Sequence, residues 1–231
     1  MMKTIGLIGG MSWESSVEYY RIINEEVKNR LGGLHSAKCL LYSVDFAEVE
    51  HFQATGEWEK AGHLLAEAAY SLEKAGAKFI VICTNTMHKV VHYIEEKIHI
   101  PILHIAEATA TQINRTGIQT VGLLGTKYTM EQDFYIKRIE ANGIKVIIPD
   151  ENDRNIVNKV IYEELCLGDI KQSSKEYYKN IIKSLVENGA EGIILGCTEI
   201  GLLVKQDDSD VPLFDTTFIH ALEAVNLALA E

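Results

Sequence analysis

The sequence predicts an α/β fold made of two similar, doubly wound parallel-sheet halves related by a pseudo-twofold axis. Two observations predict it: short runs rich in Val, Ile and Leu alternate with amphipathic stretches, and the order of these segments repeats halfway along the chain. Continuous apolar runs between helical patterns are typical of parallel strands that helices cover on both faces. The expected strands are residues 4–8, 39–44, 79–82, 102–105, 120–124, 145–148, 192–195 and 212–214.

The internal repeat is weak in each segment but consistent in its order. Four pairs of segments match along the chain: 4–9 with 120–125, 20–23 with 135–139, 76–82 with 189–195, and 100–103 with 211–214. Because the order is kept, we expect a duplicated half of about 110 residues, which is an ordinary size for one domain. We place the first domain at residues 1–100 plus 211–231 and the second at residues 101–210.

Composition and charge exclude several classes of function. The formal net charge of −11 disfavours a nucleic-acid partner, because phosphate binding requires a basic face. The apolar stretch at residues 4–11 is short and interrupted by glycines, so we interpret it as a first strand and not as a signal peptide. No apolar run reaches transmembrane length, so no membrane partner is expected. Without an export signal we expect a cytoplasmic protein whose four cysteines are reduced, namely Cys39, Cys83, Cys166 and Cys197.

Small polar side chains gather where two of the expected strands end. Residues 83–86 read Cys-Thr-Asn-Thr after one strand, and residues 196–199 read Gly-Cys-Thr-Glu after its counterpart in the repeat. Ligands of parallel sheets bind beyond the carboxyl ends of the strands. We therefore expect the active site in a cleft between the two halves, with equivalent residues approaching a ligand from opposite sides.

The repeat allows two pairings of these strand ends. Without a gap, the offset of 113 (189 − 76) pairs Cys197 with Thr84 (197 − 113 = 84), whereas a one-residue gap pairs Cys197 with Cys83. Adjacent residues of an extended strand point in opposite directions, so the choice matters. We adopt Thr84, keep Cys83 as the alternative, and interpret Cys39 and Cys166 as small buried hydrophobic residues. Cys197 precedes an expected helix N-terminus, which should lower its thiol pKa from about 8.5.

Three motifs resemble the aspartate/glutamate racemase family, and most closely its L-aspartate/glutamate-specific members. They are residues 5–11 (IGLIGGM), 85–88 (NTMH) and 196–199 (GCTE), within a likeness that runs essentially end to end. The resemblance implies an isomerase that inverts the α-carbon of acidic amino acids by two-base proton transfer, with no cofactor, pyridoxal phosphate or metal. It implies that Cys197 takes the α-proton from the L-enantiomer. Thr84 occupies the place of the family's other cysteine.

The same resemblance implies how an amino-acid substrate is bound. The substrate-binding residues would be Met11, Ser12, Gln53, Thr84, Asn85, Thr86, Thr198 and Glu199. Gln53 would lie on a mobile loop. Two cationic positions of the family are lost here, because its arginine falls near Asp45 and its lysine falls at Cys166. The resemblance therefore predicts the type of reaction more firmly than the identity of the substrate.

Other interpretations of the sequence differ in class. The glycines at residues 6–10 lack the G-x-G-x-x-G spacing and the lysine of a phosphate-binding loop. His88 and His92 lie at i and i+4 but have no third ligand at a motif-like position, so no metal site is expected. A non-catalytic small-carboxylate-binding protein stays an alternative, as does a related isomerase or decarboxylase acting on malonate- or hydantoin-type substrates. A homodimer is left open.

Overall fold

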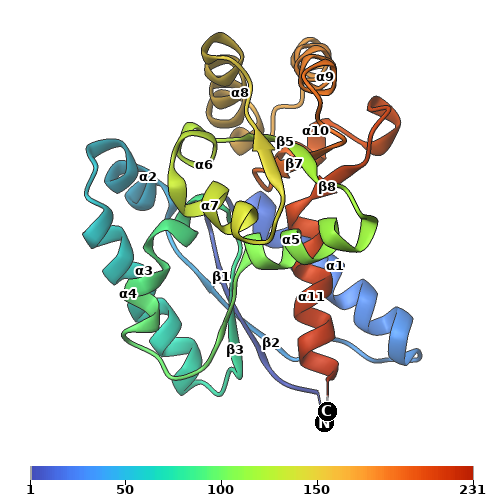
Figure 1. Ribbon diagram of the computed structural model, residues 1–231. Helices are drawn as coiled ribbons and strands as arrows, with labels where there is room; N and C mark the ends of the chain where they lie inside the picture. Colours follow the sequence, from blue (N-terminus) through green and yellow to red (C-terminus); the bar gives the residue numbers. More distant parts are fainter. Residues whose placement is uncertain (1, 231) are drawn as a thin grey trace. The chain divides into compact units, whose positions relative to one another are not determined.

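Two parallel four-stranded sheets form the frame of the protein, as the computed structural model of residues 2–230 shows. The first has the strand order β2-β1-β3-β4 and the second the order β6-β5-β7-β8 (Figure 1). The strands are β1 (Ile5–Gly9), β2 (Cys39–Ser43), β3 (Phe79–Ile82), β4 (Ile102–Leu103), β5 (Thr120–Gly125), β6 (Lys145–Ile147), β7 (Gly192–Gly196) and β8 (Leu213–Asp215). The identical order confirms the predicted α/β fold with two similar halves.

All eight expected strands are present within the described residues, with small differences at their ends. The strand expected at 102–105 stops at Leu103, because Ile105 already begins a helix. One match of the repeat was wrong by one residue. Tyr135 is fully buried and so is Tyr19, whereas Tyr20 is 54% exposed, so Tyr19 is the true counterpart of Tyr135 at the offset of 116 (135 − 19).

Helices follow the strands in both halves. In chain order, the first six are α1 (Trp13–Leu31), α2 (Phe46–Thr55), α3 (Trp58–Lys74), the 3-10 helix η1 (Thr86–Val90), α4 (Val91–Glu95) and α5 (Ile105–Thr116). Then come α6 (Lys127–Glu131), α7 (Asp133–Ala141), α8 (Glu151–Glu163), η2 (Leu165–Leu167), α9 (Gln172–Glu187), α10 (Ile200–Leu203), η3 (Gln206–Asp208) and α11 (Thr216–Leu229). No helix in residues 2–230 is both long enough and apolar enough to span a membrane.

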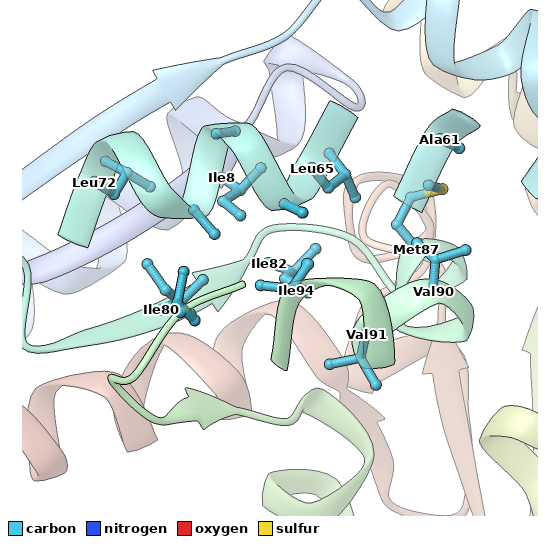
Figure 2. Packing of buried hydrophobic residues seen from close by; sticks show 14 of the residues in the cluster. Ile8, Ala61, Leu65, Leu72, Ile80, Ile82, Met87, Val90, Val91 and Ile94 are labelled. Carbon is cyan, nitrogen blue, oxygen red and sulfur yellow. The ribbon is translucent and has the colours of Figure 1, made fainter. Parts of the chain in front are cut away.

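The first sheet is covered by helices on both faces, because successive strand side chains point to opposite sides. Ile8, Ile80 and Ile82 point to one face, where they pack against α3, η1 and α4 (Figure 2). On the other face, Leu7 and Val81 join a second cluster with buried residues of α1 and α11. This arrangement matches the near-continuous apolar sequence of β1 and β3.

The chain divides into two compact units, residues 1–105 with 220–231 and residues 106–219. The sequence had suggested boundaries at 100/101 and 210/211. They lie further along the chain, because β4 pairs with β3 and β8 pairs with β7. Each of the two helices that follow these strands then joins the other unit: α5 belongs to the second from Ala106 onward, and α11 to the first from His220 onward.

Candidate active site

The strand registers define which residues of the two halves are equivalent. Ile8 lies opposite Ile82 in the first sheet, and its counterpart Leu124 lies opposite Leu195 in the second. Counting two residues beyond Ile82 and Leu195 leads to Thr84 and Cys197. The gapless pairing of the repeat therefore agrees with the observed registers.

Cys83 occupies a different environment. It is fully buried and belongs to the apolar cluster between the first sheet, α1 and α11. Burial raises the pKa of its thiol far above the ordinary value. Its equivalent is Gly196, where an added Cβ would lie 2.9 Å from the Leu124 carbonyl oxygen. A packing role accounts for Cys83.

The Cys197 thiol faces a carboxylate at the end of β7. Its Sγ donates to Oε2 of Glu199 at 2.9 Å, and the Thr198 hydroxyl donates to the same oxygen at 2.8 Å. All three residues are buried. The loop is held from the start of α11, where the Thr216 hydroxyl donates to the Leu195 carbonyl at 2.8 Å. A thiol, a hydroxyl and a carboxylate are thus fixed side by side.

The expected lowering of the Cys197 pKa is wrong. Burial raises the pKa of this thiol well above its ordinary value, and the nearby Glu199 carboxylate raises it further. The helix that follows, α10, has only four residues, and its dipole cannot offset these effects. Cys197 is therefore a protonated thiol at rest, hydrogen-bonded to a group that can accept its proton.

Thr84 lies two residues beyond the end of β3. Its amide donates to the Ile82 carbonyl at 2.8 Å, and its own carbonyl accepts a hydrogen bond from Nδ1 of His88 at 2.8 Å. The equivalent of Glu199 in this half is Thr86 (199 − 113), so a hydroxyl replaces the carboxylate. Thr84, Asn85 and Thr86 are buried.

Met11 and Ser12 lie beside this strand end, in the loop between β1 and α1. Ser12 caps α1 by accepting from the Ser15 amide, and the Ser15 hydroxyl donates to the Cys83 carbonyl at 3.2 Å. The loop after β1 is therefore tied to the chain segment that leads into Thr84. Both belong to the carboxyl end of the first sheet.

Gln53 does not lie on a loop. It is a buried residue of α2, and its Nε2 lies 3.0 Å from the sulfur of Met87 in η1. The family resemblance had implied a mobile loop, but Val49 and Gln53 share the buried side of one helix. Gln53 contacts the residue next to Thr86 and thereby borders the predicted site.

The two positions where the family's cations are missing have structural roles. Asp45 caps α2 by accepting from the Ala47 amide at 3.1 Å, and Cys166 is a half-buried residue of η2. Within residues 2–230, no group of three or more His, Cys, Asp or Glu side chains is arranged to hold a metal ion. His88 and His92 belong to η1 and α4 respectively.

The sequence did not reveal a cluster of three buried histidines behind Thr84. His88, His104 and His220 come from η1, the end of β4 and α11, and the His88 ring centroid lies 4.4 Å from that of His104 and 5.9 Å from that of His220. These residues are far apart in the sequence, and His104 and His220 match no motif.

Comparisons with known proteins agree in pointing to one family. The model of the Asp/Glu/hydantoin racemase family matches residues 8–224. A Yersinia pestis structure assigned as an Asp/Glu racemase is 59% identical, covers 99% of this chain and 100% of its own, and has a TM-score of 0.92. A Pyrococcus horikoshii aspartate racemase homologue is 38% identical over 99% of this chain and 100% of its own, with a TM-score of 0.86. The broad specificity amino-acid racemase RacX of Bacillus subtilis is 28% identical over 72% of this chain and 71% of its own length.

Proposed function

Because the chain belongs to the Asp/Glu/hydantoin racemase family, we propose that it is an amino-acid racemase that inverts the α-carbon of L-aspartate or L-glutamate without a cofactor. The observation that carries the proposal is the buried Cys197–Glu199 pair at the end of β7, with a hydrogen bond of 2.9 Å. A thiol held against a carboxylate has a route to the thiolate, which is the form that abstracts a proton. Thr84, the equivalent of Cys197 in the first half, supplies the second proton-transferring group.

The proton transfers balance as follows. The Cys197 proton passes to Glu199, and the resulting thiolate takes the α-proton from the L-amino acid. The Thr84 hydroxyl then donates its proton to the opposite face of the carbanion and regains one from water. Cys197 ends protonated by the substrate's former proton, and Glu199 releases the proton it received. No step requires an oxidant or reductant.

The carbanion next to the substrate carboxylate needs donors that absorb its charge. Asn85 and Thr86 at the end of the first sheet offer an amide and a hydroxyl from buried positions, while the Thr198 hydroxyl at the end of the second sheet already donates to Glu199. These donors are held by the backbone of short loops directly after buried strands. Little reorganisation is then needed as charge develops.

We propose acidic substrates because of the family resemblance, and not because cationic side chains stand at the two family positions that bind the substrate's side-chain carboxylate. Asp45 and Cys166 stand where many members carry positive charge, and RacX is described as having broad specificity. We therefore propose L-Asp and L-Glu as the first substrates to test. Neutral and basic L-amino acids belong in the same panel.

A direct test measures optical rotation and chiral composition after incubation with each L-amino acid, without added metal or pyridoxal phosphate. We expect the D-enantiomer to accumulate to an equal mixture for at least one acidic substrate. In deuterated water the D-product should carry solvent deuterium at Cα, while the remaining L-substrate should carry little. Binding without inversion would favour the carboxylate-binding alternative, and turnover of malonate- or hydantoin-type compounds alone would favour the related enzymes.

A further inference from the structure

His88, His104 and His220 form a cluster of buried histidines next to Thr84, and His88 contacts the Thr84 backbone directly. His88 lies between a backbone carbonyl and a backbone amide, and His220 lies between a backbone carbonyl and the Tyr19 hydroxyl. Nδ1 of His88 lies 2.8 Å from the Thr84 carbonyl, and its Nε2 lies 3.3 Å from the Ile105 amide nitrogen. Nε2 of His220 lies 2.8 Å from the Leu103 carbonyl, and its Nδ1 lies 2.8 Å from the Tyr19 hydroxyl.

These partners fix the protonation of both rings. A carbonyl only accepts and an amide N–H only donates, so His88 carries its proton on Nδ1 and accepts at Nε2. The Leu103 carbonyl likewise requires a proton on Nε2 of His220, and because burial lowers the pKa of this ring to about 4, its Nδ1 is unprotonated and accepts from the Tyr19 hydroxyl. Both rings are neutral, and burial together with the neighbouring histidines lowers the pKa of His88. His88 thereby links the loop that carries Thr84 to the first residue of α5.

In the second half, no histidine stands at the positions equivalent to His88 and His104. The equivalent of His88 is Gly201 (88 + 113), and an added Cβ there would lie 2.3 Å from Oδ2 of Asp215. Asp215 is itself the equivalent of His104, because β4 and β8 hold matching registers against β3 and β7. The Cys197 carbonyl accepts from the Ile200 amide at 3.1 Å and not from a side chain. Histidines at these positions are therefore a feature of the half that carries Thr84 and not of the half that carries Cys197.

We propose that His88 is a positioning residue that holds Thr84 in line for proton delivery, and that His220 and Tyr19 hold the His88 ring in turn. The proposal rests on the racemase function above and deepens it. A hydroxyl needs such support more than a thiol does. Its C–O bond is shorter than a C–S bond, Thr86 stands where Glu199 serves Cys197, and the hydroxyl acts only while its proton points at the carbanion. A displacement of about 1 Å can lower a rate by about 10²-fold.

Two substitutions at His88 separate positioning from packing. His88→Asn keeps a donor near the position of Nδ1 and so keeps the bond to the Thr84 carbonyl, but it loses most of the ring. His88→Phe keeps a ring of similar size and loses both hydrogen bonds. If His88 positions Thr84, H88N should retain inversion to within about tenfold of the wild type, and H88F should lose about 10²-fold. A residue that only fills space should show the reverse order.

The decisive readout is a ratio that does not depend on how much enzyme is folded. In deuterated water, we compare deuterium gained by the unreacted L-substrate with inversion to the D-enantiomer. When Thr84 delivers its proton late, the carbanion lives longer and returns to the L-face after the Cys197 thiol has exchanged. The ratio should therefore rise in H88F and stay near the wild-type value in H88N. Tyr19→Phe removes the donor to His220 and should raise the ratio by less than H88F.

Several outcomes would overturn the role of His88. These are an unchanged ratio in H88F, equal ratios in H88F and H88N, or activity that follows ring size. Failure of the racemase proposal looks different, because the wild type would then show neither exchange nor inversion with any amino acid of the panel. The role of His88 is therefore measured with an amino acid that the wild-type enzyme inverts.

Discussion

The ends of β3 and β7 share one backbone plan and carry different chemistry. Both are fully buried parallel strands that pair with the central strand of their own sheet in matching registers. One ends in a thiol hydrogen-bonded to a carboxylate, and the other in a hydroxyl whose backbone is bound by a neutral histidine. A duplicated frame has thus kept its geometry while one end became suited to accept a proton and the other to donate one.

This difference has a consequence for the two directions of the reaction. In the proposed mechanism, Thr84 only donates when the reaction starts from the L-enantiomer, whereas it would have to act as an alkoxide when the reaction starts from the D-enantiomer. Saturating rates can therefore differ between the directions. Because the equilibrium constant of a racemisation is one, kcat/KM must nevertheless be equal for both enantiomers, and the asymmetry must appear in kcat and KM separately.

Removing the thiol should have the largest effect. Cys197→Ser should lower α-proton exchange by about 10³–10⁴-fold, because a serine hydroxyl is a far weaker acid than a thiol. The measurement is loss of the α-proton signal in deuterated water. Cys83→Ser is the matched control one residue before Thr84, and it should cost about 1–3 kcal/mol of stability through a buried hydroxyl while leaving most of the exchange. Equal loss in both variants would contradict the pairing of Thr84 with Cys197.

Neutralising the carboxylate separates two roles of Glu199. Its charge raises the pKa of the Cys197 thiol, so Glu199→Gln should lower that pKa and move the basic rise of the pH–rate profile to lower pH. If Glu199 only opposed ionisation, the rate at neutral pH would increase. If it accepts the thiol proton, kcat should instead fall by about 10²-fold.

Glu191→Gln is the control for this change. Glu191 accepts from the Gln119 and Thr120 amides at 2.9 and 3.0 Å, at the opposite end of β7. Its loss should lower stability and leave the pH–rate profile in place. A faster E199Q enzyme at neutral pH would rule out Glu199 as the proton acceptor.

The strands and their equivalence could be predicted from the sequence because they depend on local apolar runs and on the spacing of the repeat. The offset of 113 identified Thr84 without any knowledge of the sheet register. The pKa of Cys197 could not be predicted in this way. It depends on the burial of the thiol and on the direction of the Glu199 side chain two residues later, and neither is visible in the letters GCTE.

Gln53 and the histidine cluster show a second limit. The family resemblance implied a mobile loop for Gln53, whereas the residue belongs to α2 and is buried on the same side as Val49. His104 and His220 lie on segments 116 residues apart (220 − 104), and only the return of α11 to the first unit brings them to His88. Contacts of this kind arise from tertiary packing and leave no local pattern.

Placing a thiol at position 84 should have a moderate effect on the rate of the D-to-L reaction. Thr84→Cys should raise the saturating D-to-L rate by about tenfold, because a thiol ionises far more readily than a hydroxyl. The gain should be limited, since Thr86 stands where Glu199 assists Cys197. The measurement is kcat from each pure enantiomer, with equal kcat/KM as an internal check. An unchanged D-to-L rate would mean that Thr84 is not the opposing donor.

The smallest effect concerns the pH dependence of stability, which the histidines should confer on the first half. Burial lowers the pKa of His220 to about 4, whereas in the unfolded chain it is about 6.5. Between these values the unfolded state binds the proton and the folded state does not, so the free energy of unfolding must fall as the pH drops from about 6.5 to about 4. The slope for one such histidine is about 1.4 kcal/mol per pH unit.

Urea unfolding at several pH values measures this slope, and His220→Gln should reduce it by up to the contribution of one histidine. His88 faces His220 and keeps its own contribution in that variant. Tyr19→Phe is the control, because it removes the donor to His220 but no histidine, and it should lower stability at every pH with nearly the wild-type slope. If H220Q and the wild type have the same slope, His220 already takes up its proton in the folded state at mildly acidic pH. Nδ1 would then donate to the Tyr19 hydroxyl oxygen and not accept from it, and the neutral ring inferred for His220 would be wrong.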